Sequence, residues 1–271
     1  MRTPLLASLM IVLIAQASPK LAEGVAALNG GDLEKAVALL EEAVAAQPAS
    51  TLPLLHLANA QLAGGPPRDA VDMTNRGRAA LKTLQQAQRV DPGDKLVMWN
   101  LAMIYGGPLQ QTEASIAQLR RLIELDPAYP NALSALGSIQ TLRALNAARQ
   151  VRMGGAGENW IADASSRERM RSAAGAFLDD ARTVLGRARS VNPSAPEPLI
   201  LMNLVLRMQA SIADDIATSN LLIEEADQLR QRGTALSQQR VARTNGPTAL
   251  DPNVPPPPFP APGAPPPPPP R

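Results

Sequence analysis

The residues that could carry out chemistry are few, and they are badly placed for it. The chain has no cysteine and a single histidine, His56, which excludes disulfides, thiolate nucleophiles and histidine-rich metal sites. Its acidic residues come as adjacent pairs, such as Asp179 and Asp180. Neighbouring residues on a helix point in different directions, so such a pair does not converge on a substrate. We therefore predict no catalytic residue, no metal site and no cofactor, and rank an enzyme last among the possible functions.

The sequence also argues against two further functional classes, nucleotide binding through a phosphate-binding loop and nucleic-acid binding. The glycine-rich run over 154–157 is not followed by the Lys-Ser/Thr of a phosphate-binding loop, and no strand pattern precedes it. The net charge is only +2, aromatic residues make up 2% of the chain, and acidic residues interrupt the arginine-rich stretch between Arg143 and Arg189. Nucleic-acid binding would need basic residues on one face together with stacking aromatics, so we predict no nucleic-acid partner.

The low aromatic content and the abundance of Ala and Leu favour packed helices over a β-sandwich. One helical pattern, a small residue followed by Leu four residues later and a third apolar residue three after that, precedes a proline four times. Spacings of four and three place these residues on one helical face, and the proline then ends the helix. The copies are Ala36-Leu40-Ala43 before Pro48, Ala80-Leu84-Ala87 before Pro92, Ser115-Leu119-Leu122 before Pro127 and Ala181-Leu185-Ala188 before Pro193.

A second regular feature follows each proline. The ninth residue after it is long and apolar in every copy, namely Leu57, Leu101, Leu136 and Met202. The next residue is small in three copies and Asn203 in the fourth. A small residue at this place allows a neighbouring helix to approach closely, so we expect a helical hairpin around each proline-terminated helix and looser packing in the last one.

Together these features resemble the tetratricopeptide repeat, whose pattern is W-x2-L-G-x2-Y, then A-x3-F, then P. Leu136-Gly137 matches the first helix of that unit, and the segments 31–36 and 123–127 are similar to the start and end of its second helix. The resemblance implies an all-α, right-handed superhelical solenoid of antiparallel helix hairpins over residues 18–243. The interval between Pro127 and Pro193 is long enough for two repeats or one elongated hairpin. We favour one hairpin, with a second arm beginning at Ser165 and a final capping helix from Ile212.

The resemblance also implies where a partner binds. Such solenoids present a concave side lined by the first helix of each hairpin. The fourth, seventh and eleventh residues after each proline are expected to face inward, and these also include Leu52, Leu96, Glu197, Ile200 and Leu204. From this set, with the neighbours His56 and Asn100, we predict as the groove Leu55, His56, Asn59, Trp99, Asn100, Met103, Asn131, Ser134 and Ser138. Trp99 and Met103 either anchor a protein or peptide partner or fill the core between repeats. We therefore expect a non-catalytic binding scaffold or adaptor.

The two ends of the chain have compositions of their own. Residues 1–17 combine Arg2, an apolar run and Ala15-Gln16-Ala17, which is typical of a secretory signal peptide and predicts a periplasmic or secreted protein. The run is too short to span a bilayer, so we expect no stable membrane span after cleavage, unless the segment is retained as a short anchor. Residues 244–271 are proline-rich, which predicts a disordered tail. The alternative function is a structural spacer, or a homo-oligomer that self-associates in the envelope, that reaches through the envelope with this tail.

Overall fold

The computed structural model describes residues 18–64, 69–151 and 160–241, and within these residues the chain forms ten helices and no strand. The predicted signal peptide (1–17) and the whole predicted tail (244–271) lie outside the described residues. The helices are α1 (Pro19–Asn29), α2 (Leu33–Ala46), α3 (Thr51–Leu62), α4 (Ala70–Val90), α5 (Lys95–Gly106), α6 (Thr112–Leu125), α7 (Pro130–Val151), α8 (Ala164–Val191), α9 (Pro196–Ser211) and α10 (Ile216–Val241).

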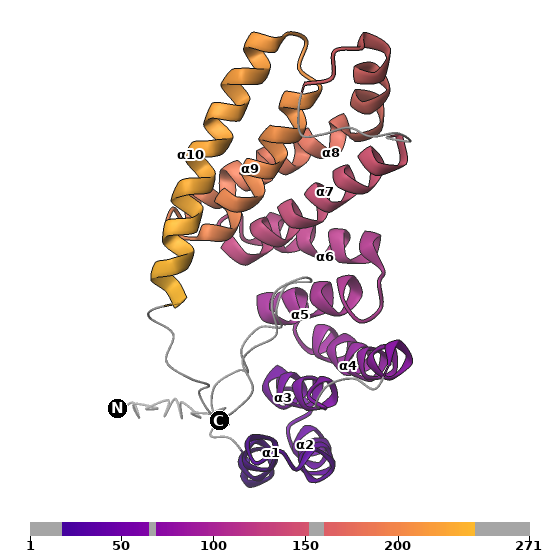
Figure 1. Cartoon of the computed structure of the whole chain (residues 1–271). Coiled ribbons are helices and arrows are strands. Elements are labelled where there is room, and N and C mark those ends of the chain that lie inside the picture. Colours follow the sequence, from indigo (N-terminus) through magenta and orange to yellow (C-terminus); the bar gives the residue numbers. More distant parts are fainter. Residues whose placement is uncertain (1–17, 65–68, 152–159, 242–271) are drawn as a thin grey trace, which may run out of the picture.

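The helices stack as successive hairpins from α1 at one end to α10 at the other (Figure 1). Each odd-numbered helix packs against the even-numbered helix that follows it, and each even-numbered helix packs against the next odd-numbered one. Helices α1 to α4 are seen nearly end-on while α7 to α10 run across the view, so the stack twists along its length (Figure 1). The predicted all-helical solenoid of hairpins is confirmed.

The four repeated prolines set the helix boundaries as the pattern predicts. The residues just before them, Gln47, Asp91, Asp126 and Asn192, are the C-caps of α2, α4, α6 and α8. Each cap donates its N–H at 2.8–3.0 Å to the carbonyl of the last residue of the pattern, and each accepts a backbone bond from the residue three further on. Proline is favoured as the second residue of such a turn because its φ is already set. One local pattern therefore ends four helices and turns the chain back.

The repeated pattern also forms the contact inside each hairpin. All twelve of its residues are at most 1% exposed. Helix α7 approaches α8 very closely at Gly137. A Cβ added to Gly137 would lie 2.5 Å from Cδ2 of Leu185, which is the leucine of the pattern in α8. In the first hairpin, a Cβ added to Gly24 of α1 would lie 2.8 Å from Cγ of Leu40, the equivalent leucine of α2. Gly24 follows no repeated proline, so the sequence analysis did not identify it as the small residue of the first hairpin.

Two helix starts differ from the predicted positions. The cap of α8 is Asp163 rather than Ser165, because the Asp163 carboxylate accepts the N–H of Ser166 at 2.7 Å. The last helix begins at Ile216 rather than Ile212, because the Asp215 carboxylate accepts the N–H of Thr218 at 2.8 Å. An aspartate before a helix satisfies its otherwise unpaired first N–H groups. The segment between Pro127 and Pro193 is the single elongated hairpin α7–α8, as favoured from the sequence.

A pair of glycine substitutions tests the close approach of α7 and α8. Gly137→Ala gains helix propensity, but its new Cβ has to displace the fully buried Leu185, so we expect a net loss in unfolding free energy on the order of 1 kcal/mol. Gly186→Ala adds a Cβ that meets nothing within 4 Å, so we expect a gain of about 0.5–1 kcal/mol. Chemical denaturation measures both. Equal stabilisation by the two substitutions would contradict the tight contact at Gly137.

Candidate functional site

Five of the nine predicted groove residues lie in the core and not on a surface. Leu55, Trp99 and Met103 are 1–3% exposed, and His56 and Asn100 are fully buried. The prediction that these five side chains meet a partner is therefore corrected. Trp99 and Met103 fill the core between repeats, which is the second of the two roles that the sequence left open for them.

Side-chain size explains this burial. Leu55, Trp99 and Met103 belong to the central apolar cluster that runs from α3 to α8. The Trp99 ring packs against Tyr129, with centroids 6.1 Å apart and planes tilted by 36°. Tyr129 stands directly before α7, so Trp99 reaches from its own hairpin to the start of the next one. Large apolar side chains at these positions fill the space between consecutive hairpins.

The other four predicted residues remain accessible. Asn59 of α3 is half-buried, and on α7 Asn131 is exposed while Ser134 and Ser138 are half-buried. Leu142 continues the same row one turn later and is 55% exposed. These four α7 residues follow helical spacing, so they share one face of the helix. The accessible residues of the predicted groove are therefore Asn59 on α3 and a continuous row on α7.

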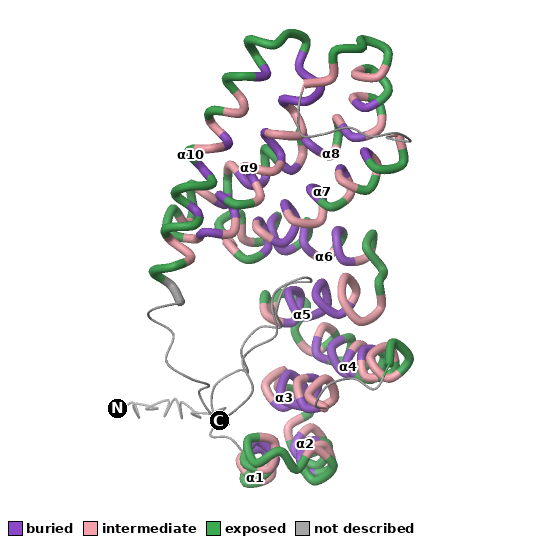
Figure 2. Tube along the Cα trace, viewed as in Figure 1, coloured by how far each residue is buried: buried purple, intermediate pink, exposed green. Residues whose placement is uncertain are grey.

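The corresponding residues of α9 are accessible as well. Ile200 is 44% exposed, and Glu197, Leu204 and Met208 are half-buried. Helices α7 and α9 contact each other, and each of them carries one of these rows. Figure 2 shows α5 as largely buried, in contrast to these helices, which carry intermediate and exposed residues. We call the two rows the open face: Asn131, Ser134, Ser138, Leu142, Glu197, Ile200, Leu204 and Met208.

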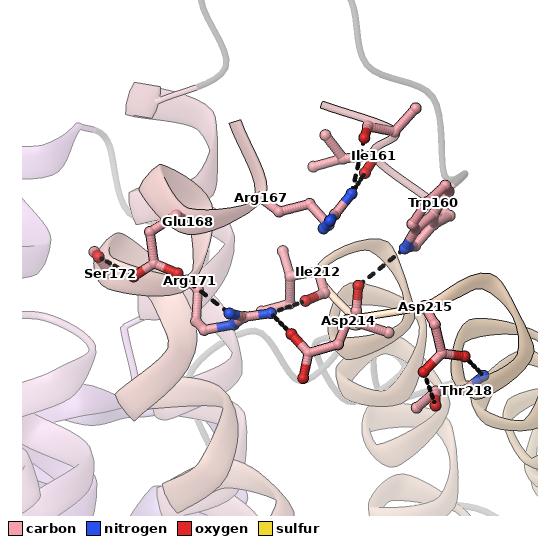
Figure 3. Close-up of polar contacts among 12 residues, drawn as sticks. Trp160, Ile161, Arg167, Glu168, Arg171, Ser172, Ile212, Asp214, Asp215 and Thr218 are labelled. Carbon is pink, nitrogen blue, oxygen red and sulfur yellow. Dashed lines mark hydrogen bonds and ion pairs between the residues drawn. The ribbon is translucent and has the colours of Figure 1, made fainter. Parts of the chain in front are cut away.

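A polar cluster that the sequence analysis missed ties the α7–α8 connection to the turn between α9 and α10 (Figure 3). The Trp160 indole donates from Nε1 to the Ala213 carbonyl at 2.9 Å, and the Ile161 N–H donates to the Ser211 carbonyl at 3.0 Å. The Arg167 guanidinium lies 4.8 Å from the centre of the Trp160 ring. These contacts hold the segment directly before α8 against the turn between α9 and α10, although the two are about fifty residues apart in the sequence.

Arg171 completes this cluster from the first turns of α8. It donates to the Ile212 carbonyl and to the Asp214 carboxylate, both at 2.7 Å, and pairs with Glu168 at 3.2 Å. Arg171 was visible in the sequence, but its acceptors at Ile212 and Asp214 belong to another hairpin. Only the packing of α8 against α9 brings them together, so no sequence spacing could identify the cluster.

Helix caps and ion pairs lower the pKa of several exposed carboxyl groups. Hydrogen bonds from Ser166 and Ser165 lower the pKa of Asp163 to about 2. The Lys95 ammonium, whose Nζ lies 2.8 Å from Oδ2 of Asp126, lowers the pKa of that carboxyl. Each of these carboxylates caps a helix end, so the perturbed groups support the fold and do not gather in one site.

The described residues contain no group of three His, Cys, Asp or Glu side chains placed to hold a metal ion. Within 18–64, 69–151 and 160–241, no helix is both long enough and apolar enough to cross a membrane.

Comparisons with known proteins agree with this architecture. A family model described as tetratricopeptide repeat matches residues 97–129, from α5 through α6 to Tyr129. A crystal structure of MamA protein is similar with a TM-score of 0.53 and 14% identity, covering 84% of this chain and 96% of that one. A second MamA crystal structure gives 0.52 at 15% identity, covering 81% and 96%. The MamA RS-1 ArsTM double mutant gives 0.51 at 11% identity, covering 84% and 99%.

At these identities the likeness to the MamA structures concerns the fold alone. Together with the family match, it confirms the resemblance stated from the sequence. Among curated proteins, none matches the chain.

Ionisation of Asp163, the N-cap of α8, makes the free energy of unfolding depend on pH between about pH 4 and pH 2. Because the pKa of Asp163 is lowered to about 2 in the folded chain, its ionised form stabilises the fold above about pH 4, and this contribution disappears as the pH falls towards 2. Asp163→Asn keeps a good cap but cannot ionise. We therefore expect the difference in Tm between the wild type and Asp163→Asn to shrink from pH 5 to pH 2. A difference that stays constant over this range would contradict the assignment.

Proposed function

We propose that this chain, whose helices form a tetratricopeptide-type solenoid, is a non-catalytic scaffold that binds a protein or peptide partner, and that it works in the periplasm or cell envelope. The observation that carries the binding proposal is the open face of α7 and α9. There the first helices of two hairpins leave Ser134 and Ile200 accessible, at the position where α3 and α5 bury Leu55 and Trp99.

The chemistry of the open face suits an extended polypeptide. Leu142 and Ile200 expose more than two-fifths of their surface, and burying such side chains is the main driving force of association. Asn131, Ser134 and Ser138 offer donors and acceptors to a peptide backbone. Met208 adds a flexible side chain that adapts to varied partners. Apolar contact area beside a polar row is the arrangement expected of a binding surface.

The proposal that the chain is exported rests on residues 1–17. Their short positive start, apolar run and small-x-small ending match a signal peptide, and the described helices begin directly afterwards with Pro19. Ser18 then becomes the first mature residue and caps α1, since its hydroxyl accepts the N–H of Leu21 at 3.2 Å.

Lysine substitutions on the open face test the binding proposal. Leu142→Lys and Ile200→Lys place a charge where a partner would be buried, so we expect each to reduce partner recovery about tenfold or more. The matched control is Leu221→Lys, which changes an exposed leucine of α10 outside the open face and should leave recovery unchanged. The measurement is affinity capture from the native envelope with quantitative mass spectrometry, followed by direct titration of the recovered partner.

Deletion of the proline-rich segment 247–271 separates this proposal from the spacer alternative. Unchanged recovery without the segment, combined with loss in both open-face variants, supports the scaffold. If instead the deletion abolishes recovery while both open-face variants behave as the wild type, the partner is held by the tail and the open-face proposal is wrong.

Cell fractionation tests export independently. We expect the mature protein to begin at Ser18, as read by N-terminal sequencing, and to be found in the periplasmic or secreted fraction. Ala15→Arg together with Ala17→Arg removes the small residues before the cleavage point and should leave an uncleaved precursor. Full-length wild-type protein confined to the cytoplasm would overturn the proposal of export.

A further inference from the structure

A small recess lies where the end of α8 meets the start of α9 and the second half of α10. Its volume is about 230 Å³. It is lined by Gly186, Arg189, Ser190, Pro193, Leu199 and Arg232. Pockets for drug-sized ligands are larger, roughly 300–1,000 Å³, so this recess suits a single small group.

Two glycines build the recess. A Cβ on Gly233 would lie 3.0 Å from Ile200 Cγ1 and 3.3 Å from Leu199 Cβ, so its absence lets α10 approach α9 closely and carries the adjacent Arg232 to the rim. On the opposite wall, a Cβ on Gly186 would meet nothing within 4 Å. One glycine therefore permits the close contact, and the other leaves the hollow open.

The two arginines of the recess differ from the others in the same helices. Each of the other arginines of α8, α9 and α10 whose side chain is described donates a hydrogen bond, to a carboxylate, a side-chain oxygen or a backbone carbonyl. The donors are Arg167, Arg169, Arg171, Arg182, Arg187, Arg207 and Arg230. Among the described residues, neither Arg189 nor Arg232 has an ion pair or a hydrogen bond, and no carboxylate lines the recess.

We propose that this recess binds a phosphoryl group, held between the guanidinium groups of Arg189 and Arg232. A phosphoryl group carries a charge of about −1.5 to −2 at neutral pH, which two arginines match, and the fork of a guanidinium fits its oxygens in a bidentate way. Ser190 donates its hydroxyl to the Arg187 carbonyl at 2.8 Å, so the donors available to the ligand are the two arginines. None of the residues that line the recess belongs to the open face.

Calorimetric titration of the full chain tests the site, first with inorganic phosphate and then with a short phosphoserine peptide, at constant ionic strength. We expect saturable binding at one site. Arg189→Ala and Arg232→Ala should each weaken it about tenfold or more, because each removes one charge-assisted pair of hydrogen bonds. Gly186→Leu should fill the hollow and also abolish binding. Arg230→Ala is the control, since Arg230 lies beside Arg232 in sequence but pairs with Asp227.

The two ligands distinguish the source of the group. A phosphoserine peptide that binds more tightly than inorganic phosphate identifies a phosphorylated partner, and equal affinities identify the free ion. The proposal is overturned if neither ligand gives saturable heat, if acetate binds as tightly as phosphate, or if Arg189→Ala and Arg232→Ala bind as Arg230→Ala does. Circular dichroism confirms that each variant retains its helices, so a loss of binding is not a loss of fold.

Discussion

Close approach of the two helices in each hairpin is the constraint on which the rest of this solenoid depends. The second helices present a face of small residues and leucine, every member of which is buried, and glycine stands opposite that leucine in the first and fourth hairpins. Small side chains permit short distances between the helix axes, which place many atoms in van der Waals contact. The hairpins are therefore well packed even though the repeated pattern of the second helices contains no aromatic residue. The same four second helices end at a proline turn, which brings the following first helix onto the stack.

The size of the side chains that lie between consecutive hairpins determines which residues of the first helices are buried and which stay accessible. In α3 and α5 the residues that face the next hairpin are Leu55, Trp99 and Met103, and the stack closes over them. In α7 the positions equivalent to Trp99 and Met103 hold Ser134 and Ser138, which stay accessible. Helix α5 therefore buries Trp99 and Met103, whereas α7 and α9 leave Leu142 and Ile200 at the surface, where binding a partner would bury them.

The sequence predicts the repeat well because the repeat is local. Helix ends, buried faces and hairpin pairing all follow from spacings within about forty residues, and the prolines mark them directly. The groove was predicted less well, because spacing identifies the face of a helix but not how closely the next hairpin covers it. Trp99 illustrates the difference: its position is that of a groove residue, yet Tyr129 packs over it from the start of α7. The Trp160 cluster and the recess combine residues of different hairpins, and no local pattern connects them.

The two features that sequence could not reveal lie at opposite ends of α8. The helix is 28 residues long, about 42 Å at 1.5 Å per residue. Its first turns are fixed to the α9–α10 turn through Arg171 and through Trp160 just ahead of it, and its last turn forms one wall of the recess. A rigid helix held at its start transmits that position to its end. The cluster therefore holds the start of α8 against the α9–α10 turn, while the end of the same helix contributes Arg189 to the recess.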